Sequence, residues 1–208
     1  MAVDLKKHEE YNMKNAVCRL CRREQAKLFL KGERCYSPKC SVTKRPYAPG
    51  AAGQNKSGKM SDYNKQLRAK QKAKAIYRVR ETQFKNYYLQ ASKTRGQKGV
   101  ALLQLLERRL DNVVYKLSFA SSREEAKQLV SHRKIMVNNK ILNINSYLVE
   151  VGDEIKLITK NQKLVNKDVP IWLDLNKKDF SGKIVNIPNR DEIEQEINEQ
   201  LIVEFYSR

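Results

Sequence analysis

Apolar residues recur three or four positions apart in the middle of the chain, which predicts helices. The predicted helices cover residues 62–78, 81–92, 100–117 and 123–132. The third has a strongly apolar face, and the fourth opens with Ser122-x-x-Glu125, the pattern of a capping box. Phe84 and Tyr88 fall on the apolar side of the second helix, so we expect them in a core rather than against a ligand.

Short β-like runs follow the fourth helix and are separated by turn residues, which predicts a small sheet. The runs are 135–137, 141–142, 147–149 and 155–158. Together with the two preceding helices they predict a small α+β module. Residues 171–173 and 184–185 are expected to be short strands or packing anchors. For the apolar end, 201–206, periodicity alone does not choose between strand and helix.

Positive charge is concentrated in the first half of the chain. The 208 residues carry a formal net charge of +19. The first hundred hold 25 basic and 7 acidic side chains, whereas the remainder holds 17 and 16. Repulsion of this density opposes a compact state unless a polyanion neutralises it, and nucleic acid is the polyanion we expect. The alternatives are a basic face kept for solubility and a membrane surface. The latter lacks a basic amphipathic helix with an apolar face, and Trp172 lies outside the basic half.

Several protein classes are excluded by the sequence. No stretch of about 18 apolar residues occurs, so we expect no membrane span. The first residues lack the charged start and apolar run of a secretory signal, so we expect a cytoplasmic protein. The apolar fraction of 40% suits modest cores rather than one large one.

All four cysteines lie close together, as Cys18-x2-Cys21 and Cys35-x4-Cys40. Each pair can form a chelating turn, and four thiolates satisfy a closed tetrahedral zinc site of the structural kind. The intervening segment is too short and polar to bury a core, so metal binding would supply the missing folding free energy. We therefore expect one zinc ion as cofactor.

Two disulfides or four reduced thiols are the alternatives to zinc. Disulfides need an oxidising compartment, which nothing in the sequence indicates. A redox Cys-x2-Cys motif would need a βαβ context that is absent here. Neither alternative explains the clustering as well as a metal does.

Arginines, lysines and two tyrosines of the basic half are the candidate nucleic-acid ligands, because Arg suits bidentate phosphate contact. A loop over residues 41–60, rich in Pro and Gly, can follow a phosphate backbone. The start of the fourth helix adds backbone N–H groups that favour phosphate. The full set is Arg19, Arg22, Arg23, Lys31, Arg34, Lys39, Lys44, Arg45, Tyr47, Lys56, Lys59, Tyr63, Arg68, Lys72, Ser122, Arg123, Lys127 and Arg133.

The order of several motifs resembles bacterial-type small-subunit ribosomal protein four in its zinc-bearing form. The resemblance covers nearly all of residues 16–208. The matching stretches are Cys18–Arg23, Leu30–Cys40, Arg45–Tyr47 with Pro49–Gly50, Ser61–Tyr63, Arg108–Tyr115, Ser146–Tyr147, Gly152–Ile155 and Asn198–Arg208. The order and the ending are more specific than any single motif.

The resemblance implies a structural constituent of the small ribosomal subunit, not an enzyme. Such a protein binds 16S rRNA early in assembly, contributes to translational accuracy, and in some members represses its own messenger. The resemblance also implies the fifth small-subunit protein and messenger RNA as neighbours, with no membrane and no small-molecule substrate. It makes the chain's end a helix that returns to the first lobe.

The implied fold is α+β, with an N-terminal zinc knuckle, a helical lobe and an inserted small α+β RNA-binding module of two helices and an antiparallel sheet. The expected parts are an unassigned extension at 1–17, the knuckle at 18–45, a helical lobe at 46–98 plus 196–208, and a second lobe at 99–195 that contains the module at 108–166.

The chain departs from the family at Arg133 and Asn139, which stand where the family usually has Gly. Asn tolerates positive φ well and Arg tolerates it poorly. The helix end near His132 is therefore expected to differ, which puts an RNA contact by His132 in doubt. Arg133 is either an exposed cation that caps the helix or a phosphate ligand.

Two other functions are alternatives to the ribosomal one. An RNA-modifying enzyme could use the same module as an anchor, but it needs a catalytic domain for which residues 167–208 are too few. A zinc-ribbon regulator that binds DNA needs a recognition helix or a dimer zipper, and neither pattern is present.

Overall fold

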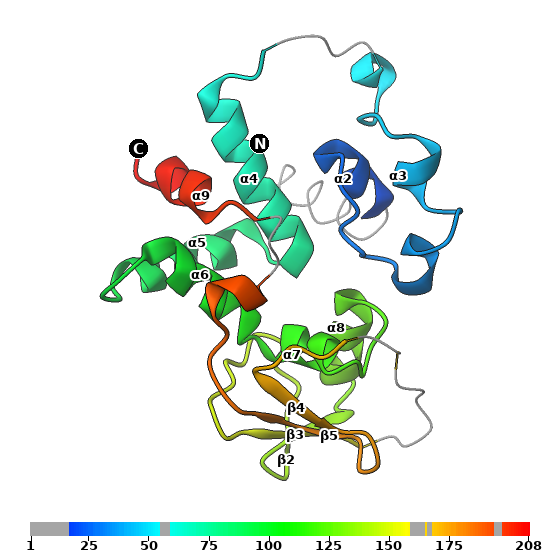
Figure 1. Ribbon diagram of the computed structural model, residues 1–208, viewed down its shortest axis with the longest axis vertical. Coiled ribbons are helices and arrows are strands. Elements are labelled where there is room, and N and C mark those ends of the chain that lie inside the picture. Colours follow the sequence, from blue (N-terminus) through cyan, green and yellow to red (C-terminus); the bar gives the residue numbers. More distant parts are fainter. Residues whose placement is uncertain (1–16, 55–58, 159–164, 166–167, 194–196) are drawn as a thin grey trace, which may run out of the picture. The chain divides into compact units, whose positions relative to one another are not determined.

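The computed structural model, drawn in Figure 1, consists of two compact units, residues 1–61 and 62–208. It describes residues 17–54, 59–158, 165, 168–193 and 197–208. No helix in these segments has the length and apolar character that a membrane crossing needs.

The first unit, which we call the cysteine unit, has short helices joined by tight turns. These are α2 (Val17–Glu24), the 3-10 helix η1 (Gly32–Cys35), α3 (Ser41–Lys44) and the 3-10 helix η2 (Ala51–Gly53). Among the described residues of this unit, the buried apolar side chains besides the cysteines are Leu28, Leu30 and Ala48. The apolar core of this unit is small, so a further stabilising interaction is expected.

The second unit begins with a helical lobe. Its helices are α4 (Asp62–Tyr77), α5 (Glu81–Ser92), α6 (Lys98–Glu107) and, at the end of the chain, α9 (Glu199–Tyr206). Helix α9 packs against α4 and α6, as Figure 1 shows. The returning C-terminal helix that the resemblance implied is thereby confirmed, as are the helices predicted at 62–78 and 81–92.

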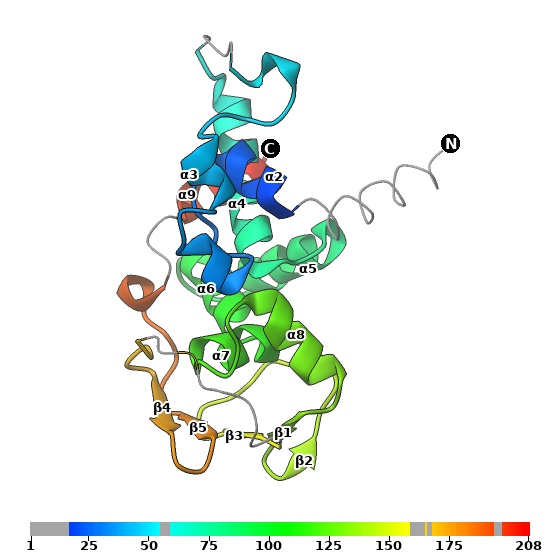
Figure 2. The same cartoon turned by 90° about the vertical axis from the view of Figure 1, so that its right-hand side faces the viewer.

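A sheet module lies between α6 and α9 in the sequence. It contains α7 (Leu110–Lys116), α8 (Arg123–Ser131) and an antiparallel sheet in the order β2-β1-β3-β5-β4. The strands are β1 (Ile135–Val137), β2 (Lys140–Ile141), β3 (Glu154–Leu157), β4 (Leu173–Asn176) and β5 (Ser181–Ile184), and a 3-10 helix, η3 (Arg190–Glu192), follows them. Figure 2 shows α7 and α8 on one side of the sheet. The predicted α+β fold is confirmed.

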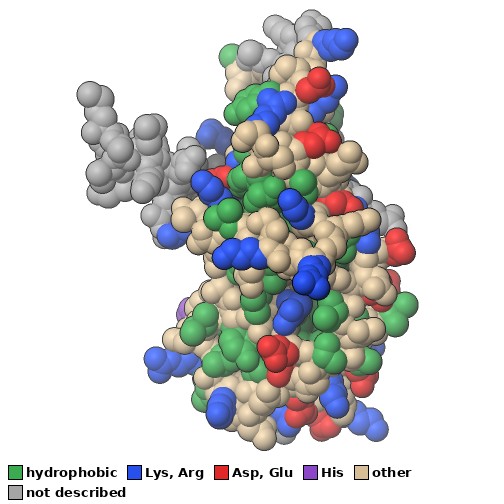
Figure 3. Space-filling view, turned by 90° about the vertical axis from the view of Figure 1, so that its left-hand side faces the viewer, with side chains coloured by type: hydrophobic (Ala, Val, Ile, Leu, Met, Phe, Trp, Pro, Cys, Tyr) green, Lys and Arg blue, Asp and Glu red, His purple; other side chains and the backbone are tan. Residues whose placement is uncertain are grey.

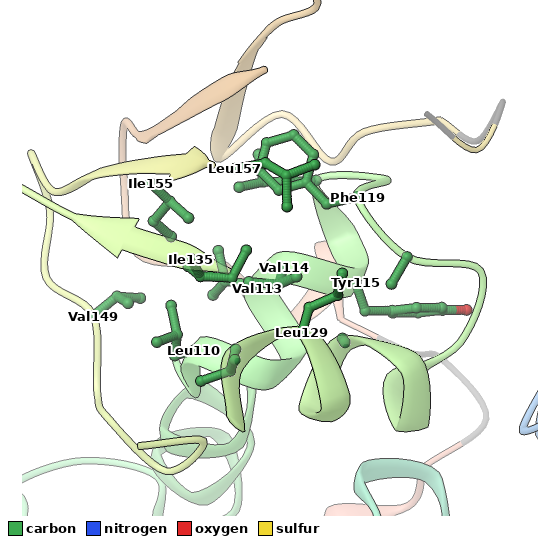
Figure 4. Packing of buried hydrophobic residues seen from close by; sticks show 14 of the residues in the cluster. Leu110, Val113, Val114, Tyr115, Phe119, Leu129, Ile135, Val149, Ile155 and Leu157 are labelled. Carbon is green, nitrogen blue, oxygen red and sulfur yellow. The ribbon is translucent and has the colours of Figure 1, made fainter. Parts of the chain in front are cut away.

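The core of the module lies between these two helices and the sheet. Figure 4 shows Val113 and Val114 of α7 pointing toward Ile135 and Ile155 of the strands. Strand β5 approaches α7 so closely that a Cβ at Gly182 would lie 2.4 Å from the Leu117 side chain. A larger residue there would require the buried Leu117 side chain to shift, because real Cβ contacts are not that short.

Two predictions about this region were wrong in detail. The expected single helix at 100–117 is broken, because Arg109 takes an extended conformation and pairs with Leu148 in an isolated β-bridge. The Asn112 side chain donates to the Glu107 carbonyl, which satisfies part of the exposed end of α6. The run expected to be a strand at 147–149 forms only that bridge.

Helix α9 is held to the lobe by a cluster of charged and aromatic side chains around Glu81. Lys70 and Lys74 donate to its two carboxylate oxygens, and the Tyr206 hydroxyl donates at 3.0 Å. The Lys70 ammonium also lies 4.5 Å from the centre of the Phe205 ring. Burial by itself raises the pKa of Glu81, but the two lysines outweigh it and hold that pKa below its ordinary value. The cluster therefore anchors the chain's end through an ionised carboxylate.

We predict that Glu81→Gln lowers the free energy of unfolding at pH 7 by about 1 kcal/mol, because charged hydrogen bonds are lost at a partly exposed site. Since the folded-state pKa of Glu81 is lowered, its contribution is present above the unfolded value of about 4.3 and is lost as the pH falls. Urea denaturation at pH 7 and at about pH 3.5 should show the two proteins converging in acid. Glu150→Gln, at an exposed position, is the control. An equal difference at both pH values would contradict the assignment.

Candidate metal centre and RNA interface

The four cysteines converge on one small pocket of the cysteine unit. Helix α2 places Cys18 and Cys21 three residues apart and so on the same face. Cys35 ends η1, and Cys40 directly precedes α3. All four line the pocket, together with Val17, Leu30, Lys31, Arg34, Ser41 and Val42. The spacing thus brings together the side chains that the sequence singled out.

Backbone N–H groups point at the cysteine sulfurs. The N–H of Lys31 donates to Cys35 Sγ at 3.3 Å, and Leu28 provides a backbone hydrogen bond to Cys21. Burial raises the pKa of the Cys21 thiol to about 11, and the neighbouring cysteines add to that rise. Burial also acts to raise the pKa of Cys40, but backbone hydrogen bonds at the start of α3 outweigh it and lower that pKa. A bound cation would offset the repulsion that four clustered thiolates create.

The donor set suits a soft metal ion. The pocket offers four sulfurs, and none of its lining residues supplies a carboxylate or an imidazole. In the described part of the chain, no three His, Cys, Asp or Glu side chains meet the geometry of a metal site. The residue types therefore suit a tetrathiolate centre, but the cysteines do not take its geometry here, so the centre and its metal both stay predictions.

Most of the predicted RNA ligands of the cysteine unit are exposed. These are Arg19, Arg23, Lys31, Arg34, Lys39, Lys44, Arg45 and Lys59. Lys56, like most of the extension predicted at 1–17, falls outside the described residues. Arg22 is instead held within the protein. Its Nε donates to the Tyr47 backbone carbonyl at 3.0 Å, and its guanidinium lies 4.9 Å from the centre of the Tyr47 ring. Arg22 and Tyr47 thus connect α2 to the loop that follows α3.

An aromatic pair in this unit was missed by the sequence analysis. Phe29 and Tyr36 lie with ring centroids 5.0 Å apart, and Tyr36 is 62% exposed. A signal existed, because two aromatic residues flank a Lys-Gly turn in a cationic segment. Their spacing does not match a helix or a strand, so periodicity did not mark them.

Helix α4 carries three more predicted ligands at its surface. Tyr63 is 51% exposed and packs on Phe205, while Arg68 and Lys72 are half-buried. Lys70 and Lys74 of the same helix are instead paired with Glu81. The helix therefore divides its cations between an internal anchor and its surface.

The three predicted ligands at the start of α8 face the protein interior. Ser122 is buried and accepts the N–H of Glu125, as the capping box predicted. Arg123 is 4% exposed, donates to Asn112 Oδ1 at 2.8 Å, and lies over the rings of Tyr77 and Tyr115. Lys127 donates to the Arg78 carbonyl, and burial lowers its pKa. Their contact with phosphate stays a prediction, which this inward placement does not favour.

Arg133 follows α8 with an exposed side chain and a φ of 58°. Positive φ is costly for a long side chain and is the conformation that Gly would adopt freely. Asn139 also has positive φ, at 63°, in the turn between β1 and β2. Both positions thus take the positive φ that Gly adopts, so the prediction of a differently shaped helix end near His132 was wrong.

A buried polar network that the sequence analysis did not predict joins the helical lobe to the sheet module. The Tyr77 hydroxyl donates to Glu107 at 2.7 Å, and Asn112 donates to the other Glu107 oxygen at 2.6 Å. Arg109 pairs with Asp111 and donates to the Tyr87 hydroxyl. Buried ions stay only where such partners satisfy them.

Charges of both signs are interspersed over the sheet module. Figure 3 shows this on the lower part of the visible face, where the sheet lies. The nearly balanced second half of the sequence accounts for that mixture. The cationic excess therefore lies in the cysteine unit and the helices that directly follow it.

We predict that Arg123→Ala lowers the free energy of unfolding by about 3 kcal/mol, since it leaves Asn112 without its donor and removes two cation–π contacts. Arg133→Ala, at the exposed end of the same helix, should change it by less than about 0.5 kcal/mol. Urea denaturation followed by the fluorescence of the buried Trp172 measures both. Similar small losses in the two variants would show that Arg123 is not held as described.

Comparisons with known proteins identify the family of the chain. The family model described as ribosomal protein S4/S9 N-terminal domain matches residues 12–107, and the S4 domain matches residues 108–155. The small ribosomal subunit protein uS4 of Dictyoglomus thermophilum is 52% identical over 92% of this chain and 96% of its own length. The uS4 protein of Thermodesulfovibrio yellowstonii is 49% identical over 93% of this chain and 97% of its own length. The uS4 protein of Caldicellulosiruptor saccharolyticus is 52% identical over 92% of this chain and 96% of its own length. The chain belongs to the uS4 family of small ribosomal subunit proteins.

Proposed function

We propose that this protein is a structural constituent of the small ribosomal subunit that binds 16S rRNA through its cysteine unit and helix α4. The observation that carries this proposal is the exposed cationic surface of the cysteine unit, on a chain whose relatives are named as small-subunit proteins. Folded RNA is the polyanion that neutralises such a surface, through release of counterions from its phosphates.

Binding of this kind needs cations that are correctly positioned along the RNA backbone, and it needs no catalytic group. Helical RNA is recognised mainly through its backbone and shape, so we expect few base-specific contacts. The exposed arginines of the cysteine unit can each hold a phosphate bidentately, which fixes orientation as well as adding affinity. The family is generally non-enzymatic, and structural RNA binding accounts for the cationic surface without a catalytic group.

The division of labour that we propose follows the expected domains. The knuckle at 18–45 and the helical lobe, 46–98 with 196–208, bind RNA. The second lobe, 99–195, adds the S4-type module at 108–166. The polar network between α6 and α7 supports this arrangement, because it holds the module against the helical lobe.

The cysteines form the proposed zinc centre of the knuckle. Cys18, Cys21, Cys35 and Cys40 would hold one ion as thiolates, and the ion would supply folding free energy to a unit with few buried apolar residues. The N–H groups directed at the sulfurs support this role, since they stabilise thiolate charge. The centre would be structural, because four protein ligands leave no open position.

The finer roles implied by the family belong to the same proposal. They are contact with the fifth small-subunit protein, a position near the path of incoming messenger RNA, an effect on translational accuracy, and repression of the protein's own messenger. Assembly at a surface rich in exposed cations is compatible with each of them.

The RNA proposal predicts a strong dependence of affinity on salt. If about ten phosphates are neutralised, log K against log salt has a slope near −9, and a slope shallower than about −3 would contradict the proposal. Filter binding to a 16S rRNA transcript measures the slope, with duplex DNA as competitor. Arg34→Gln should make the slope shallower by about 1, while Lys178→Gln, exposed on the sheet module, should leave it unchanged.

The metal proposal predicts about one zinc per purified chain. Cys21→Ser should lose the metal and unfold the cysteine unit, whereas Ser41→Ala, in the same pocket, should keep it. Elemental analysis measures the metal and circular dichroism the folding. The fluorescence of Trp172, which lies in the other unit, should stay unchanged. Stoichiometric iron, or no metal at all, would overturn the assignment.

A further inference from the structure

The Phe29–Tyr36 pair forms an aromatic surface on the outside of the cysteine unit. The rings are tilted by 31° with centroids 5.0 Å apart, and the Tyr36 side chain is largely exposed. Leu28 and Leu30, on either side of Phe29, are both buried. The leucines therefore take the inner positions of this turn, and Phe29 lies half-buried against Tyr36.

The backbone at Phe29 is strained. Its φ is 50°, in the left-handed region that bulky residues rarely adopt. Glycine or asparagine would make the same turn at lower cost. Strain of this kind is held by the surrounding structure and clusters at functional sites, and here it accompanies the contact of the Phe29 ring with Tyr36.

Exposed cations occur throughout the same segment. Lys27, Lys31, Arg34 and Lys39 are all exposed, with one exposed carboxylate, Glu33, among them. An aromatic face with cations beside it matches a nucleotide in an unpaired part of RNA, because such a nucleotide offers a flat base and flanking phosphates. A base inside a duplex is already stacked and could not reach the ring.

We propose that the face of Tyr36, supported by Phe29, stacks on one unpaired base of the ribosomal RNA, while the neighbouring cations bind its flanking phosphates. This inference rests on the proposed function and adds a contact to a base where that function needs only phosphates. Stacking tolerates any base, so the contact recognises an unpaired nucleotide rather than a sequence.

Substitutions at Tyr36 separate stacking from packing. The full chain, purified with its metal, is titrated with a 16S rRNA transcript. Tyr36→Phe keeps the ring and should bind within about twofold of the original protein, whereas Tyr36→Leu keeps an apolar contact with Phe29 and should bind about tenfold more weakly. The salt slope should be unchanged in both, because no charge is removed. Lys39→Gln is the matched control, which removes a charge and should make the salt slope shallower by about 1.

Zero-length ultraviolet crosslinking gives a direct readout that a structural role would not produce. Tyr36 should crosslink to one nucleotide, mapped by primer extension, and that nucleotide should be unpaired. Metal content and thermal unfolding of the Leu variant should match those of the original protein.

Each outcome decides the proposal. A Leu variant that binds like the original protein, or a crosslink to a paired nucleotide, overturns it and leaves the proposed function standing if the Lys39 and Arg34 variants still change the salt slope. A Leu variant that loses metal shows that the ring is needed for folding, and the absence of any crosslink in the original protein then overturns the proposal. If the original protein does not bind the transcript at all, both proposals are overturned.

Discussion

Repulsion between cations is the constraint on which the rest of this structure depends. A formal charge of +19 on 208 residues opposes compaction, so each cation that the fold takes inside needs a partner there. Lys70 and Lys74 share Glu81, and Arg109 pairs with Asp111. Arg123 donates to Asn112 and lies over two tyrosine rings. The cations that are left outside form the surface proposed for RNA.

This sorting explains why the sequence predicted the elements better than the roles of individual cations. The sequence identified α4 and α5 almost to their ends, although the buried side of α4 includes Gln66 and Lys70 besides its apolar residues. The break between α6 and α7 could not be found in that way, since it depends on the pairing of Arg109 with Leu148, which lies far along the chain. Whether a basic residue points inward is equally non-local. Arg123 and Arg133 are both candidates in the sequence, and only the fold makes one buried and the other exposed.

In the cysteine unit the sequence predicted the site better than the local structure around it. The spacing of four cysteines predicted their convergence on one pocket without any knowledge of the fold, because short chelating turns are local. The contact between Phe29 and Tyr36 could not be predicted from the sequence, because a left-handed residue in a short turn leaves no periodic pattern. Function in a unit of this kind follows from turns, and propensities for helix and strand say little about it.

The return of α9 to the helical lobe has a consequence for how the protein is made. Gln66 donates a hydrogen bond to Glu204 across 138 positions of the chain, and α9 packs along α4. During synthesis, domains fold from the N-terminus onward, but this lobe cannot close until its last residues leave the ribosome. Until then the side of α4 that carries Gln66 and Lys70 has no cover, and the nascent chain exposes its cations beside a large supply of ribosomal RNA. A newly made copy therefore passes through an open state in which premature RNA contact competes with completion of its own fold.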